Sequence, residues 1–149
     1  MAGFRLIAGC LLGLSLLACD RNENVPQAVG ELRPQPACDP VARVCEANGE
    51  GIGLSFRFGP GVAALKPFPV RVWPAPGVRI EKLVLSFRMS GMDMGLNRYR
   101  LVEQPDGAWQ AGVTLPVCTS GRTDWFVDLE LWTDAGLWRG TLPFTLLPR

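Results

Sequence analysis

The residues best suited to chemistry in this chain are three methionines in one short run, Met89-Ser90-Gly91-Met92-Asp93-Met94-Gly95. The only other methionine is Met1. A thioether is a soft, neutral ligand that selects Cu(I) over hard cations. It is also flexible and apolar, and it commonly fills gaps in a hydrophobic core. Both explanations stay open, and we predict a Cu(I) site formed by Met89, Met92 and Met94.

The spacing M-x-x-M-x-M allows two or three sulfurs to converge on one ion if the loop curls, and Gly91 and Gly95 permit sharp turns. Thioethers need no deprotonation and form no disulfides, which suits an oxidising compartment. Met89 also continues the inward alternation of the preceding apolar run, so it could instead be a core residue. Asp93 is a hard ligand, and we expect it to be a turn residue that faces water.

Other kinds of site are excluded by composition. The chain has no histidine, which rules out a blue-copper site, a histidine-containing zinc site and catalysis by imidazole. With 15 basic and 14 acidic residues, it carries a net charge of +1 and no basic patch for nucleic acid. No nucleophile–base pairing, phosphate loop or nucleotide fingerprint occurs, so we do not expect an enzyme.

The first eighteen residues have the pattern of a signal peptide: Arg5, then apolar or small residues from 6 to 18 apart from Ser15. This apolar stretch is too short to span a bilayer. It ends in Leu16-Leu17-Ala18-Cys19, which resembles the lipobox of bacterial lipoproteins. The resemblance implies that Cys19 carries acyl chains that anchor the protein to a membrane. Asp20 then resembles a retention signal for the periplasmic side of the inner membrane.

Residues 19–37 are polar and rich in proline, which predicts a flexible tether ahead of a folded domain at 38–149. Cys10 would leave with the signal peptide, so Cys38, Cys45 and Cys118 remain as candidates for one disulfide and one spare thiol. We favour a bridge from Cys38 or Cys45 to Cys118, because a long closed loop restricts the unfolded chain most. The spare thiol could be a metal ligand, an intermolecular partner or inert. Asp39-Pro40 could cap a short helical turn.

From residue 51 onward apolar and polar side chains alternate, which predicts strands rather than helices. The expected runs are 52–58, 68–72, 83–87, 99–101, 109–115, 125–131 and 142–146. Seven short strands separated by Gly and Pro turns favour an all-β, immunoglobulin-like sandwich of two antiparallel sheets. A small closed barrel is the alternative. The clearest hairpins run from 101 to 109 and from 132 to 138, and Pro69 suggests an edge strand. The methionines would then lie in a loop between strands ending near Arg88 and starting near Asn97.

The chain also resembles a family. The block 84–129, with the methionine run, Tyr99, Gly107-Ala108-Trp109, Leu115-Pro116-Val117-Cys118 and Trp125, is similar to the FixH/YtkA-like group of membrane-anchored immunoglobulin-like domains. The resemblance implies a role near copper import or cytochrome oxidase assembly. We therefore predict a lipid-anchored Cu(I)-binding protein with a copper-relay or membrane-complex partner. The alternative is a metal-free interaction module in which the methionine loop is an adaptable contact surface.

Overall fold

The computed structural model describes residues 26–146. The predicted signal peptide and the predicted lipidation site, Cys19, lie outside this range. Within it the chain forms strands and turns and no helix. The strands are β1 Ala28–Glu31, β2 Arg33–Pro34, β3 Cys45–Gly49, β4 Ile52–Phe58, β5 Phe68–Pro74, β6 Ile80–Arg88, β7 Arg98–Arg100, β8 Val102–Glu103, β9 Trp109–Val113, β10 Asp124–Thr133 and β11 Gly136–Thr145.

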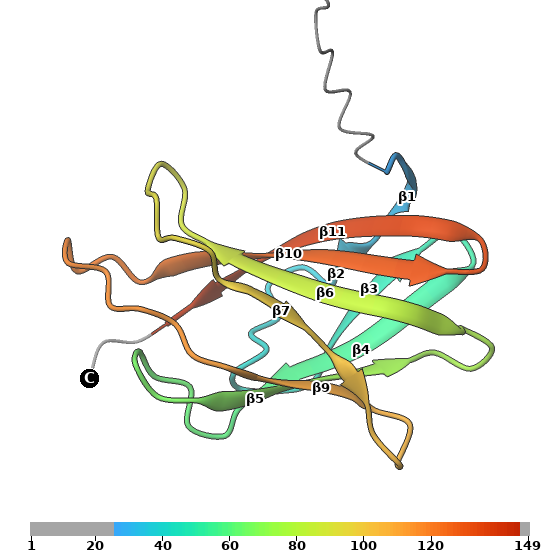
Figure 1. The fold of residues 1–149 in the computed structure, drawn as a ribbon, viewed down its shortest axis with the longest axis horizontal. Coiled ribbons are helices and arrows are strands. Elements are labelled where there is room, and N and C mark those ends of the chain that lie inside the picture. The colour runs from blue at the N-terminus through green and yellow to red at the C-terminus, as the bar shows by residue number, and fades with distance from the viewer. Residues whose placement is uncertain (1–25, 147–149) are drawn as a thin grey trace, which may run out of the picture.

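These strands form two sheets that face each other (Figure 1). One has the order β1-β11-β10-β6-β7 and the other the order β2-β3-β4-β5-β9-β8. All pairings are antiparallel except that of β1 with β11. The predicted all-β, immunoglobulin-like sandwich is confirmed, with eleven strands in the described chain in place of seven. The predicted hairpins are β8–β9 and β10–β11.

The core forms where the alternating side chains of the two sheets meet. On β10, Trp125, Val127 and other apolar residues at every second position are buried, while the residues between them are more exposed. Three aromatic rings join the sheets: Phe144 lies edge-on to Phe58 at 5.3 Å and to Phe87 at 6.0 Å between ring centroids. Such pairs contribute about 0.5–1.5 kcal/mol beyond the burial of their area. Alternation of this kind explains why the seven expected strands form.

Pro69 does not mark an edge strand, because β5 lies between β4 and β9. The N and C=O of a residue in an antiparallel strand point towards the same neighbour. The Pro69 carbonyl accepts a hydrogen bond from the Gly59 N–H at 2.8 Å, one residue beyond the end of β4 at Phe58. The missing proline N–H therefore falls where the β4 ladder has already ended, so a central strand tolerates the proline.

The folded domain begins earlier than the predicted boundary at residue 38. Residues 28–34, expected to belong to a tether, form β1 and β2, which pair with β11 and β3. Between them Leu32 is only 1% exposed and donates its N–H to the Arg139 carbonyl at 2.7 Å. The alternation of apolar and polar residues in this segment is too short to predict a strand, because Leu32 is flanked by polar residues and followed by Pro34.

The predicted bridge to Cys118 is wrong: Cys38 pairs with Cys45, and Cys118 is a free thiol. The Cα atoms of Cys38 and Cys45 are 5.8 Å apart, within the usual range for a disulfide. A single turn brings them together, in which the Asp39 carbonyl accepts the N–H groups of Ala42 and Arg43 at 3.2 and 3.1 Å. Chain geometry decides which cysteines can meet, and it outweighs the entropic advantage of a longer loop.

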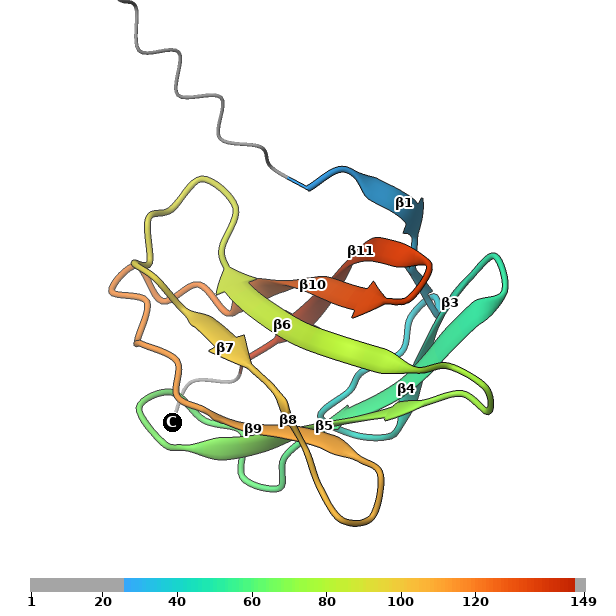
Figure 2. The ribbon, with the colours of Figure 1, turned by 45° about the vertical axis from the view of Figure 1, so that its right-hand side comes forward.

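Two loops meet at one end of the sandwich, residues 89–97 between β6 and β7 and residues 114–123 between β9 and β10 (Figures 1 and 2). The methionine loop thus has the predicted bounds. β1 lies towards the other end, because it pairs with Leu137, Trp138 and Arg139 near the β10–β11 turn. The ten residues of β11 run from one end towards the other, a span of about 30 Å.

Candidate metal centre

The methionine loop turns back on itself immediately after β6. Met89 and Met92 form a β-bridge, and the Met92 N–H donates to the Met89 carbonyl at 3.4 Å. Gly91 adopts a φ of 70°, a left-handed conformation that a side chain would disfavour. The sequence Ser90-Gly91 thus provides a tight turn that returns Met92 to the end of the sheet.

Side chains within the loop fix its second half. The Asp93 carboxylate accepts a hydrogen bond from the Gly95 N–H at 2.8 Å. The Asn97 side-chain amide donates to the Met94 and Gly95 carbonyls at 2.8 and 3.3 Å. Asp93 is exposed, as expected for a turn residue. These contacts fix the backbone of the loop around Met94.

The three methionines have different surroundings. Met89 is 2% exposed and belongs to the core, because it continues the inward parity of Phe87. Met92 and Met94 are half-buried and pack against the edge of that core. The packing explanation therefore accounts for Met89, whereas the other two thioethers lie near the surface.

A sulfur contact between the two loops involves a residue from outside the methionine run. The Cys118 Sγ lies 3.6 Å from the Met92 Sδ. The Ser120 Oγ lies 3.0 Å from the Cys118 Sγ and 3.8 Å from the Met92 Sδ. Sequence reasoning named Met92 and Cys118 separately and missed Ser120. Nothing local could have joined them, because they meet only when the 114–123 loop reaches the 89–97 loop.

Arg122 ties the two loops together. Its guanidinium donates to the Ser90 carbonyl at 2.9 Å and to the Asp124 carboxylate through Nε, also at 2.9 Å. The Gly121 N–H donates to the Cys118 carbonyl at 3.1 Å, which closes the turn that presents the thiol. The position of Cys118 relative to Met92 is therefore set by polar contacts on both loops.

The environment of Cys118 favours its thiolate. The hydrogen bond with Ser120 lowers the pKa of the Cys118 thiol and outweighs burial, which acts in the opposite direction. The backbone N–H groups of Ser120 and Arg122 and the Arg122 charge lower the pKa further. Cys118 as a whole residue is only 8% exposed, which limits its contact with oxidants.

Comparison with known proteins adds no assignment. The chain matches no family model, no curated protein and no solved structure. The FixH/YtkA-like resemblance remains a prediction drawn from the motif. No helix long and apolar enough to cross a bilayer occurs in residues 26–146.

Conventional metal ligands do not converge elsewhere in the described chain. Within residues 26–146, no group of three His, Cys, Asp or Glu side chains is arranged to hold an ion. The pairing of Met92 with Cys118 is the arrangement that offers two soft ligands in contact.

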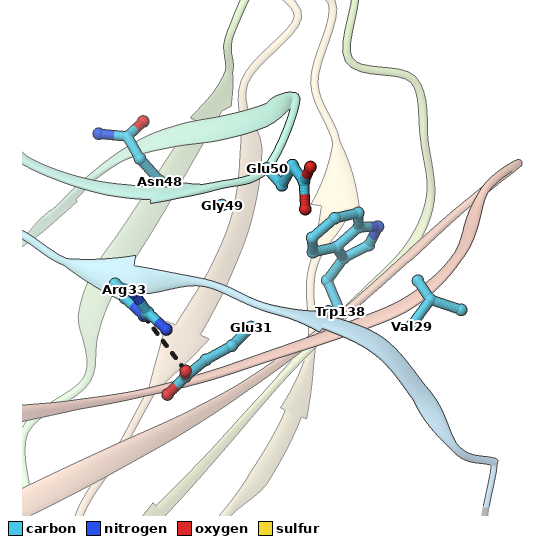
Figure 3. A pocket seen from close by; sticks show the side chains of 8 residues that line it. Val29, Glu31, Arg33, Asn48, Gly49, Glu50 and Trp138 are labelled. Atoms are coloured by element: carbon cyan, nitrogen blue, oxygen red, sulfur yellow. Dashed lines mark hydrogen bonds and ion pairs between the residues drawn. The ribbon is translucent and has the colours of Figure 1, made fainter.

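A hollow at the other end of the sandwich is not a comparable site. It has a volume of about 320 Å³ and lies beside β1, β3 and β11 (Figure 3). The Trp138 ring packs on Gly30, where an added Cβ would overlap it. The polar wall consists of exposed side chains, including an ion pair between Arg33 and Glu31 at 3.3 Å. No nucleophile or soft ligand lines it.

Proposed function

We propose that this protein is a membrane-anchored periplasmic lipoprotein that binds Cu(I) through Met92 and Met94 and passes it to a protein partner, as in oxidase assembly. The supporting observation is the contact between the Met92 Sδ and the Cys118 Sγ, which lie 3.6 Å apart at the end of the sandwich. Soft sulfur ligands select Cu(I) over the hard cations that are more abundant outside the cytoplasm.

The half-buried loop suits metal transfer. Neutral thioethers bind without releasing a proton and are weaker ligands than thiolates, so a metal held by them can be handed on. Met92 and Met94 are partly accessible, whereas Met89 lies beneath them in the core. A partner could therefore approach the ion from outside without opening the sandwich.

The position of the loop relative to the predicted anchor supports the same function. Cys19 precedes Ala28, the first residue of β1, by nine positions, a span of at most about 30 Å. β1 enters the sandwich towards the end opposite the methionine loop. The methionine loop therefore lies at the end of the domain away from the point where the chain leads to the predicted anchor, which suits contact with another protein.

Anaerobic titration of the purified full chain with Cu(I), in competition with a coloured cuprous chelator, tests the proposal. We expect wild type to bind one equivalent and a Met92→Ala/Met94→Ala double variant to bind at least about 100-fold more weakly. Leu96→Ala is the matched control, because Leu96 is 90% exposed in the same loop and carries no sulfur. Equal affinity of wild type and the double variant rejects the proposal.

The alternative function, a metal-free interaction module, is favoured by one further observation. Leu96 is 90% exposed and Val117 is 51% exposed, so each of the two loops presents an apolar side chain to solvent. Met92→Leu separates the hypotheses, because leucine keeps the packing and removes the sulfur. In a metal-free module the variant retains its partner in a pulldown, whereas in a copper carrier it loses affinity for Cu(I).

A further inference from the structure

We infer that Cys118 is a Cu(I) ligand and that it forms, with Met92, a mixed thiolate–thioether site. This inference rests on the proposed function and adds a thiolate to the methionine ligands expected from the sequence. Its basis is the 3.6 Å separation between the Cys118 Sγ and the Met92 Sδ, two residues that are 26 positions apart in the chain and lie in different loops.

The separation of the two sulfurs fits a shared ion. Sulfur ligands about 2.3 Å from a metal, at a tetrahedral angle, lie about 3.8 Å from each other. The observed distance of 3.6 Å is close to this value. Binding therefore requires the two side chains to rotate towards a common point and does not require the loops to move apart or together by several ångströms.

The surroundings hold both ligands in place. Arg122 bridges the loops through the Ser90 carbonyl, and the Met89–Met92 bridge fixes the backbone of the thioether ligand. A cavity of about 50 Å³ borders Cys118 and is also lined by Gly121, Arg122 and Trp125. The thiol is thus not packed tightly on every side, and its side chain can turn.

Binding of Cu(I) to Cys118 requires no oxidant or reductant. The Cys118 S–H bond breaks, its proton goes to water, and the sulfur lone pair forms the bond to Cu(I), which keeps its oxidation state. Ser120 can then donate its hydroxyl hydrogen to the thiolate over the 3.0 Å that separates the Cys118 Sγ from the Ser120 Oγ.

Two measurements on the purified full chain test the inference. The first is Cu(I) affinity, by the chelator competition described above, for wild type, Cys118→Ser and Cys118→Ala. We expect both variants to bind at least about 100-fold more weakly, since even groups that only orient a metal ligand are worth 10–100-fold. The second is alkylation of Cys118, followed by mass spectrometry. We expect one equivalent of Cu(I) to slow it at least tenfold in wild type.

The variants Met92→Leu and Leu96→Ala complete the alkylation experiment. Met92→Leu should weaken the protection of Cys118 by Cu(I), because the second ligand is lost, whereas Leu96→Ala should preserve it. Near-ultraviolet circular dichroism checks that every variant is folded.

Different results would contradict the role of Cys118 and the binding of Cu(I) by the protein. Unchanged affinity in folded Cys118→Ser and Cys118→Ala, or no protection of Cys118 in wild type, overturns the role of Cys118 and leaves copper binding by methionine intact. Absence of Cu(I) binding in wild type overturns both.

Discussion

At the scale of single residues, the alternation of side chains along β6 explains why one methionine is buried in the core and the others lie near the surface. Met89 extends the inward-facing series of β6 and is buried, whereas Met92 follows a tight turn that returns it to the surface. The same residue type thus fills a gap in the core at one position and offers a sulfur ligand three positions later. The chemical role of a methionine here depends on where the backbone leaves the strand.

Replacing Met89 with leucine should leave copper binding unchanged. The two side chains have similar volume, and swaps of this kind in a core usually cost less than about 1.5 kcal/mol. Chemical denaturation measures the stability of Met89→Leu, and the cuprous competition measures its affinity. A tenfold or greater loss of affinity in the folded variant would show that Met89 is a ligand after all.

At the scale of elements, the exposed face of the β6, β10 and β11 sheet carries a ladder of paired charges. Arg88 on β6 donates two hydrogen bonds to Asp128 on β10, and Thr141 on β11 donates a third at 2.7 Å. One strand away from Arg88, Arg98 on β7 pairs with Glu130. These contacts link the four strands that support the methionine loop, although each exposed pair contributes little stability.

Asp128→Asn should destabilise the protein by about 0.5–1 kcal/mol at neutral pH, the range for partly exposed pairs. Burial raises the pKa of Asp128, but the hydrogen bonds from Arg88 and Thr141 outweigh it and hold the pKa below its usual value. The folded state therefore favours the carboxylate. This stabilisation is fully present above the unfolded pKa of about 3.9 and is lost as the pH falls through the folded pKa.

Urea denaturation of wild type and Asp128→Asn at pH 7 and near pH 3 measures this effect. The difference in unfolding free energy between the two proteins should shrink in acid, as wild-type Asp128 takes up its proton. A difference that grows on acidification would contradict the assigned direction of the pKa shift.

At the scale of the whole molecule, the N-terminal segment contributes to both sheets. β1 belongs to one sheet and β2 to the other, and Leu32 lies buried between them. Gly140 on β11 makes room for the passage, because an added Cβ there would collide with the Leu32 backbone. The segment therefore closes one edge of the sandwich, and only residues 20–27 remain to separate the predicted anchor from the fold.

Leu32→Ala should destabilise the domain by about 2–5 kcal/mol, the usual cost of truncating a fully buried leucine. Val29→Ala is the matched control: Val29 is 56% exposed in the same segment, and its truncation should change stability by less than about 0.5 kcal/mol. Thermal and urea unfolding of the full-length variants measures both. Equal, negligible effects would mean that residues 28–34 behave as a tether.

The sequence by itself determined the features that depend on neighbours along the chain. Alternation predicted seven of the strands from β4 onward and the inward direction of Met89, because side chains in a strand alternate between its faces. The turn residues between the apolar runs predicted the two tight hairpins. Alternation could not reveal β1, β2, β3 and β8. These strands have too few apolar residues to form a pattern, and pairing with each other or with β11, β4 and β9 stabilises them.

Only the tertiary structure decided which distant residues meet. It paired Cys38 with Cys45, gave Pro69 a central strand and placed the Cys118 thiol against Met92. Each outcome depends on how two sheets stack and on which loops then share an end of the sandwich. Those distances are set by packing across the core, which local spacing does not encode.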